Sequence, residues 1–393
     1  MQIDGHHAAT YVAARAAEFN HSEAATIAYA AQYVDDATNG GPILFENSEY
    51  MYARIASAHG MIDYQNVIDV ANHLAWIPFH FLPGNGGLPA GQEPPGGETA
   101  KLICTPDSPV ARDMLRATLA DKDSPRALHR LGIAMHVYAD TFAHQGFMGA
   151  INPANHIEDV KSSDSRYDAR IKGSTIKSML LGAWKKSKAA VLLFAASLVQ
   201  SWKERKWPTK FWKDFMGETP LGHAAADTFP DQPYLIWTYL DWTGKRVDRR
   251  NPVIFLEAVD MMTRALRAWR SGTTCMDLTK YAGLGPVDVQ VVNRLFRDID
   301  EPEGERRHLR WLDAIAAGEF SFGPATLQYV GKGVGSWKQH ALGTLKKEDT
   351  GYERYEYSPG FLLSDWKLFH DALQAHRSDV VHNILPRYGI CAA

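Results

Sequence analysis

Three side chains that can bind a metal ion recur at helical spacing within residues 124–146. His136, Asp140 and His144 follow one another at intervals of four residues, which places them along one face of a helix with successive Cβ atoms roughly 6 Å apart. Imidazole nitrogen and carboxylate oxygen are zinc's usual ligands other than thiolate. Because a carboxylate between two histidines can bridge neighbouring ions, the spacing predicts one or two metal ions with Asp140 as the bridge.

The same segment has residues typical of a helix start and a helix end, which predicts one continuous helix. Ser124 suits the N-cap, Pro125 the first helical position and Gly146 the residue that ends the helix. An alternative interpretation is an ordinary solvated polar face, but the neighbours are apolar, and a polar stripe in apolar surroundings needs partners. These neighbours are Met135, Val137, Tyr138, Phe142 and Phe147.

The composition of the 393 residues is that of a globular protein. Hydrophobic residues make up 45% and charged residues 22%. This composition excludes a chain that is mainly disordered, collagen-like or coiled coil. The net charge of −3 produces no global field that would select a polyanionic partner. The cysteines are Cys104, Cys275 and Cys391, odd in number and far apart, so neither a disulfide framework nor a cysteine-only zinc site is expected.

The sequence shows no targeting pattern. Its first residues, MQIDGHHAATYVAARAAEF, lack the basic start and the apolar run of a signal peptide. The longest apolar run, 189–199, is too short to cross a bilayer. A cytoplasmic location is therefore expected, although export by a route without a cleaved signal is compatible with the same pattern.

Helical periodicity and helix caps predict an all-α fold in one large domain spanning 1–393. No alternating run of β-branched residues is long enough to predict a strand. A Pro/Gly-rich loop is expected at 83–97. The predicted helices cover 8–19, 22–36, 67–81, a helix starting at Pro109, 124–146, a short helix starting at Pro220, 251–270, 285–299, 303–317 and 361–385.

Residues 161–213, here called the basic segment, form an insertion that differs from the rest of the chain. They hold 13 lysines and arginines against three acids, a net charge of +10, and their apolar residues recur at helical spacing. One interpretation is a core-packed helix with a solvated basic back, and another is peripheral contact with an anionic membrane surface. Trp202, Trp207 and Trp212, interleaved with lysine and arginine, are also compatible with stacking on nucleic-acid bases.

A series of histidine and aspartate motifs along the chain resembles a known enzyme family. In chain order the motifs are GHHAATYVA (His6), AQYVD (Asp35), FHFLP (His80), HVYAD (His136 and Asp140), a following His144, and the pair His223 and Asp227. In this order they are similar to the zinc-dependent phospholipase C and single-strand nuclease superfamily. The members of that superfamily are all-helical enzymes with three zinc ions in one cleft.

The resemblance implies a ligand set for three zinc ions, of which at least two are expected. The first ion would take Asp35, His80, His136 and Asp140, the second His144, His223 and Asp227, and the third His6 with the bridging Asp140. Asp35 and Asp140 would also be the catalytic carboxylates. Family members place an N-terminal tryptophan amine on the third zinc. Here Asp4 is expected to substitute, because its carboxylate lies two residues before His6.

Three spacings depart from the family pattern and leave alternatives open. Asp140 and His144 are separated by three residues where the family usually has five. The long interval before His80 leaves His59 as an alternative ligand. The long interval before His223 leaves a different closing pair, His156 with Glu158 or Asp159.

The chemistry implied by the resemblance is hydrolysis of a phosphodiester. Clustered divalent ions lower the pKa of water and neutralise charge on the phosphodiester oxygens. The basic segment favours a membrane phospholipid as the substrate, as in a phospholipase C. The alternatives are a single-strand nuclease or nucleotidase of the same superfamily, and a helical binding module whose metals are structural.

Overall fold

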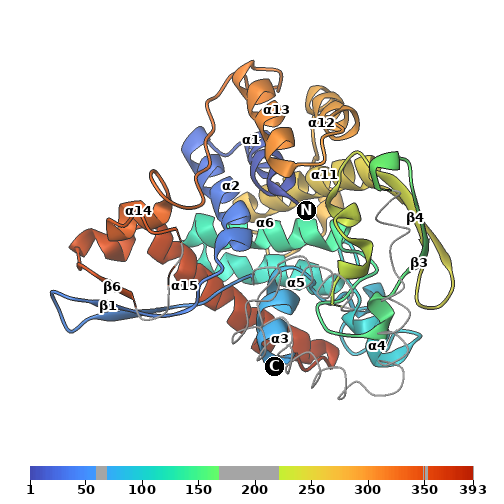
Figure 1. Ribbon diagram of the computed structural model, residues 1–393, viewed down its shortest axis with the longest axis horizontal. Coiled ribbons are helices and arrows are strands. Elements are labelled where there is room, and N and C mark those ends of the chain that lie inside the picture. Colours follow the sequence, from blue (N-terminus) through green and yellow to red (C-terminus); the bar gives the residue numbers. More distant parts are fainter. Residues whose placement is uncertain (59–68, 168–220, 348, 350–352, 393) are drawn as a thin grey trace, which may run out of the picture.

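The computed structural model of the protein is organised around one buried helix (Figure 1). It describes residues 1–393 except 59–68, 168–220, 348, 350–352 and 393. The central helix is α6 (Ala127–Ala143), and all of its residues except Leu128 are buried. A helix that is apolar on nearly every side is expected to be enclosed by other elements. Helices that pack around it are α2 (His21–Asp36), α5 (Pro109–Ala117), α11 (Asn251–Ser271) and α15 (Asp365–Ser378).

The helix predicted over 124–146 is confirmed with shorter ends. It begins at Ala127 after Arg126, and His144 is its C-cap. Ser124 does not cap it, because the Ser124 hydroxyl donates to the Asp121 carbonyl instead. The Ser124 side chain, which the sequence predicts as the N-cap, therefore stabilises the turn that precedes the helix.

Most other helices lie where caps and periodicity predict them. Helix α2 begins one residue before the predicted start, because Asn20 and Glu23 form a reciprocal capping box. The predicted helix 361–385 is instead α15 followed by a π-helical and a 3₁₀ turn. The remaining α-helices of the described residues are α1 (Thr10–Ala16), α3 (Asp69–Phe79), α4 (Gly97–Leu102), α12 (Pro286–Asp298), α13 (Gly304–Ala316) and α14 (Trp337–Leu342).

Short helical turns connect these elements. Two are π-helical, η1 (Asp4–Ala9) and η11 (Asp379–Ile384). The 3₁₀ turns are η3 (Asn85–Gly87), η4 (Thr118–Asp121), η5 (Pro153–Asn155), η6 (Ser165–Tyr167), η7 (Ala224–Ala226), η8 (Phe229–Asp231), η9 (Leu278–Lys280), η10 (Pro359–Leu363) and η12 (Leu385–Tyr388). The predicted helix 8–19 is continuous with η1 and ends earlier, at Ala16.

Two small β-sheets make the all-α prediction wrong. Of the described residues, 54% are helical and 10% are in strands. One sheet has the order β2-β1-β6 and the other β3-β4-β5. Figure 1 shows β1 and β6 at one end of the molecule and β3 and β4 at the opposite end. The strands are β1 (Gly41–Phe45), β2 (Met51–Arg54), β3 (Glu158–Ser162), β4 (Ile236–Leu240), β5 (Arg246–Arg250) and β6 (Glu353–Tyr355).

Each strand has only three to five residues, which is too short to produce a long alternating run in the sequence. The antiparallel β4–β5 hairpin had a local signal, since IWTYL is rich in aromatic and β-branched residues and is followed by a Gly-containing turn. Strand β6 had none. It pairs in parallel with β1, Ile43 opposite Glu353, from about 300 residues further along the chain.

The predicted loop 83–97 contains the η3 turn and ends at Gly97, where α4 begins, and the Asn85 amide donates to the Leu88, Pro89 and Gln92 carbonyls within it. The basic segment falls mostly outside the described residues, so its predicted helix stays a prediction. No helix among the described residues is long and apolar enough to cross a membrane.

The stability of the fold is expected to fall in acid partly through His370 on α15. This imidazole is buried, and burial first, then the Arg54 charge, lowers its pKa to about 3. The unfolded side chain binds a proton near pH 6.5. Stability is therefore lost as pH falls below 6.5, by about 2–3 kcal/mol at pH 4.5. Denaturant unfolding at pH 7 and pH 4.5 should show a smaller acid loss in His370→Gln than in the parent protein. Substitution of the exposed His382 by Gln should leave the loss unchanged, and an equal acid loss in His370→Gln would contradict this role.

Candidate metal centre

A first group of side chains that could hold a metal ion lies where α2, α3 and α6 meet. Asp35 is in the last turn of α2, His80 follows α3, and His136 and Asp140 lie one turn apart on α6. His80 Nδ1 is 3.1 Å from His136 Nε2 and 3.4 Å from Asp140 Oδ2, and His136 Nε2 is 3.3 Å from Asp140 Oδ2. Asp35 Oδ1 is 3.8 Å from His80 Nδ1 and 3.9 Å from His136 Nε2. Ligands about 2.0–2.1 Å from a tetrahedral zinc are about 3.3–3.4 Å apart, so this group, the first cluster, has nearly that size.

A close helix crossing positions the first cluster. Gly132 of α6 lies against α2, so closely that a Cβ there would be 2.4 Å from the Ile27 carbonyl oxygen. One turn further, the His136 Nδ1–H donates to the Ala31 carbonyl of α2 at 2.8 Å. The crossing therefore brings the end of α2, with Asp35, to the histidine and aspartate of α6.

A second group, the second cluster, forms at the C-terminal end of α6. His144 Nε2 is 3.2 Å from Asp231 Oδ1, and His223 Nε2 is 3.4 Å from Asp231 Oδ2. These three donor atoms lie within 4.8 Å of one another. Asp140 connects the two clusters, because its Oδ2 is also 3.6 Å from His144 Nδ1.

A third group joins His6 of η1 to α6. His6 Nε2 is 3.2 Å from Asp140 Oδ1, and the His6 ring stacks on the His136 ring with 3.7 Å between centroids. Among the described residues, neither ring nitrogen of His6 nor Asp140 Oδ2 has a partner with hydrogen-bond geometry, and the 3.2 Å contact between His6 Nε2 and Asp140 Oδ1 is a close approach only. Buried polar atoms without partners are uncommon and call for an explanation such as a bound ion. His6, His136 and Asp140 are here called the third cluster.

Hydrogen bonds to backbone carbonyls orient four of the five imidazoles. His136 Nδ1 donates to the Ala31 carbonyl, His80 Nε2 to Ser57, His144 Nδ1 to His80 and His223 Nδ1 to Asp227, at 2.7–3.0 Å. Each bond places the proton on the nitrogen that faces the carbonyl. The other nitrogen then presents a lone pair to the clusters, which is how metal-binding histidines are usually held.

One buried amino group faces the two buried carboxylates of the site. Burial alone would raise the pKa values of Asp140 and Asp231, but nearby cationic groups outweigh it and hold both well below the usual range. The Met1 amino group is 2.6 Å from Asp140 Oδ1 and 3.1 Å from Asp231 Oδ1. Burial opposes its charge, yet these two acids raise its pKa to about 11. Burial, His136 and the Met1 amino group lower the pKa of His6 to about 4, so its ring is neutral at pH 7.

Two of the predicted ligands do not join the clusters. Asp4 is buried, and its carboxylate pairs with Arg307 Nε at 2.6 Å. The position beside His6 expected for Asp4 is taken by the Met1 amino group. Asp227 is not one of the grouped side-chain donors, and its backbone carbonyl accepts a hydrogen bond from His223 Nδ1. Residues 224–226 form a single 3₁₀ turn and Asp227 has a positive φ of 51°, so the i, i+4 geometry of an α-helix is absent.

Asp231 occupies the place predicted for Asp227. It ends η8, eight residues after His223, and both of its oxygens face histidines of the second cluster. A signal was present, since the run TFPDQP places a second acid after an aromatic residue and a proline. Which of the two acids, Asp227 or Asp231, reaches the histidines depends on the path of the chain after the η7 turn.

The alternative ligands considered from the sequence do not join the clusters where the structure describes them. His156 pairs with Glu158 at 3.3 Å, and Asp159 is an exposed partner of Arg246 and Lys161, so none of the three faces the described clusters. His59 lies outside the described residues.

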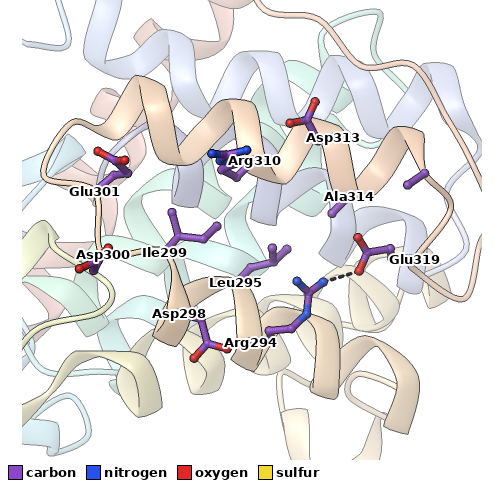
Figure 2. Close-up of a pocket in the computed structure, with 11 residues that line it drawn as sticks. Arg294, Leu295, Asp298, Ile299, Asp300, Glu301, Arg310, Asp313, Ala314 and Glu319 are labelled. Atoms are coloured by element: carbon purple, nitrogen blue, oxygen red, sulfur yellow. Dashed lines mark hydrogen bonds and ion pairs between the residues drawn. The ribbon is translucent and has the colours of Figure 1, made fainter.

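A separate groove runs between α12 and α13 (Figure 2). Leu295 and Ala314 line it together with charged residues, and Arg294 and Glu319 form an ion pair across it. None of the clustered side chains lines this groove. The groove is therefore separate from the candidate metal centre.

The chain belongs to a family described as a family of unknown function (DUF6765), whose model matches residues 1–384. The match includes every residue of the three clusters. Neither the comparison with curated proteins nor that with solved structures finds a match.

Proposed function

We propose that the protein is a zinc-dependent phosphodiester hydrolase of the phospholipase C type, similar to the superfamily that its motifs resemble. The observation that carries the proposal is the orientation of the imidazoles. Four histidines donate one N–H to a backbone carbonyl and turn the other nitrogen toward shared carboxylates. Lone pairs that converge in this way need a cation between them.

The donor set fits zinc and no more than three ions. All side-chain donors of the clusters are imidazole nitrogens or carboxylate oxygens, a combination that zinc accepts with tetrahedral geometry. The unpartnered ring nitrogens of His6 and the unpartnered Oδ2 of Asp140 provide further donors. The three overlapping groups support two or three ions, with Asp140 shared between them.

An open side favours catalysis over a purely structural role. The Asp35 side chain is 33% exposed, whereas the side chains of His136 and Asp140 are almost completely buried. Structural zinc sites are closed by protein ligands, while catalytic sites keep one position for water or substrate. Asp35 therefore marks the mouth of the site.

When bound, zinc would lower the pKa of a water molecule and offset negative charge on the phosphodiester. Residues of the chain would orient the water, accept its proton and hold the ions. Asp35, at the mouth, would orient the attacking water and accept its proton. Its Oδ2 receives a hydrogen bond from the Gln32 amide at 3.4 Å. Asp140, buried on α6, holds the three clusters together.

The substrate that we favour is a membrane phospholipid. The basic segment lies in the sequence between His144 and His223, two residues of the second cluster, and carries a net charge of +10. Lysines near an anionic membrane contribute about 1 kcal/mol each to binding. Single-stranded nucleic acid is the alternative substrate, since basic residues and tryptophans also contact phosphates and bases.

We expect the purified protein to release phosphorylated headgroup from vesicles of phosphatidylcholine and phosphatidylserine. A chelator should abolish the activity and added zinc should restore it. His136→Ala should be inactive, while His156→Ala, the same change at a histidine outside the clusters, should be active. Cleavage of single-stranded DNA or RNA with intact vesicles would overturn the choice of substrate. Absence of all phosphodiester cleavage by zinc-loaded protein would overturn the proposed hydrolase.

A further inference from the structure

A buried arginine outside the clusters connects two segments that carry cluster residues. Arg307 of α13 is completely buried and uses all five of its N–H donors. Its Nε and Nη2 donate to the two Asp4 oxygens at 2.6 and 3.3 Å, and Nη2 also donates to Gln2 Oε1 at 2.7 Å. Its Nη1 donates to Gln232 Oε1 at 2.8 Å and to the Glu301 carbonyl at 2.6 Å.

The partners of Arg307 adjoin the candidate ligands. Asp4 begins η1, the turn that carries His6 of the third cluster. Gln232 directly follows Asp231 of the second cluster. These two segments lie more than 220 residues apart in the sequence, and no donor atom of Arg307 reaches a cluster itself.

A second buried side chain fixes the Asp231 segment from another direction. Asn251, at the start of α11, donates from its amide to the Phe229 and Gln232 carbonyls, both at 2.7 Å. Arg307 holds the same segment through the Gln232 side chain. Asn251 restrains the backbone around Asp231, whereas Arg307 ties that segment to Asp4, and the Met1 amino group contacts the Asp231 carboxylate itself at 3.1 Å.

We propose that Arg307 is a positioning residue that sets the distance between His6 and Asp231, and so controls zinc binding at the second and third clusters. This inference rests on the proposed zinc function. The planar guanidinium can hold two oxygens of Asp4 and the Gln232 amide oxygen at once, whereas a lysine ammonium is a single point of attachment. The first cluster receives no direct contact from Arg307 or its partners Gln2, Asp4 and Gln232.

The test is zinc titration of Arg307→Lys in competition with a chromophoric chelator. Residues that orient metal ligands typically change affinity 10–100-fold, and we expect a loss of that size for the ions of the second and third clusters. Zinc binding to the first cluster should stay within threefold of the parent value. The matched control is Arg130→Lys, because Arg130 is also buried and paired, with Asp379 at 2.7 Å, but has no partner beside a cluster residue. This control should lower thermal stability without changing the zinc titration.

Double variants locate the effect. The loss caused by Arg307→Lys should add fully to that of His80→Ala, which removes the first cluster, and only in part to that of His223→Ala, which removes the second cluster and leaves the third. A milder variant, Gln232→Met, keeps the Arg307–Asp4 pair and should weaken zinc binding at the second cluster only.

Two results would overturn the inference. One is parent-like zinc affinity in Arg307→Lys or Gln232→Met, and the other is an equal loss at all three clusters, as general destabilisation would produce. If the parent protein itself binds no zinc, the proposed function fails with it. If the parent binds zinc and either variant matches it, only the role of Arg307 fails.

Discussion

Asp140→Asn is expected to reduce bound zinc from two or three ions to at most one and to lower phosphodiesterase activity to roughly 1% or less. Oδ1 of Asp140 faces His6, and Oδ2 faces His80, His136 and His144 at 3.3–3.6 Å. An amide would present a nitrogen donor to one of these sides and would carry no charge to offset the ions. Elemental analysis after gentle purification, together with the vesicle assay, measures both effects.

Thermal unfolding adds a third measurement to this comparison. A ligand present at 100 times its dissociation constant stabilises a protein by about 2.7 kcal/mol, so loss of zinc should also lower the melting temperature. The control is Asp159→Asn, the same chemical change at an exposed side chain that pairs with Arg246 and Lys161. Full zinc content in Asp140→Asn, or a larger loss in Asp159→Asn, would contradict the bridging role of Asp140.

Gly132→Ala is expected to destabilise the fold by about 1–3 kcal/mol, the usual cost of overpacking a core. In an ordinary helix the same change is stabilising by roughly 0.5–1 kcal/mol. At Gly132 the added Cβ would be 2.4 Å from the Ile27 carbonyl oxygen and 2.7 Å from Ala30 Cβ, so α2 must move away from α6. The movement would separate Asp35 from His136 and weaken the first cluster.

Denaturant unfolding and zinc titration of Gly132→Ala measure both consequences. Gly360→Ala is the control, because the nearest atom to its added Cβ would be Ser358 Oγ at an ordinary 3.7 Å. Its effect should stay within about 0.5 kcal/mol, as for most surface changes. If Gly132→Ala proves as stable as Gly360→Ala, the two helices are not held at the distance seen here.

Local patterns allowed the helical part of the candidate site to be predicted. His136, Asp140 and His144 share a face because of the helical repeat, which depends only on spacing. The N-terminal ends of α5 and α11 follow from Ser108 and from Pro252 in the same way. Such features are encoded within a few residues and need no knowledge of the rest of the chain.

Features that join distant segments could not be predicted in this way. The all-α prediction failed on strands of three to five residues, one of which pairs with a strand about 300 residues away. Asp4 was expected at the third cluster because it lies near His6 in the sequence, but the buried Arg307 charge on α13 holds its carboxylate elsewhere. A buried arginine needs a paired acid, and the sequence does not reveal which acid that is.

By itself the sequence determined the kinds of candidate ligand and their spacing on α6, because a histidine and aspartate stripe inside an apolar helix needs buried polar partners. Only the tertiary structure decided which partners these are. Asp231, and not Asp227, faces His144 and His223, because the chain leaves the η7 turn with a positive φ at Asp227 and returns to the cluster at η8. That path depends on Asn251 and Arg307, which hold the segment around Asp231 from two other helices.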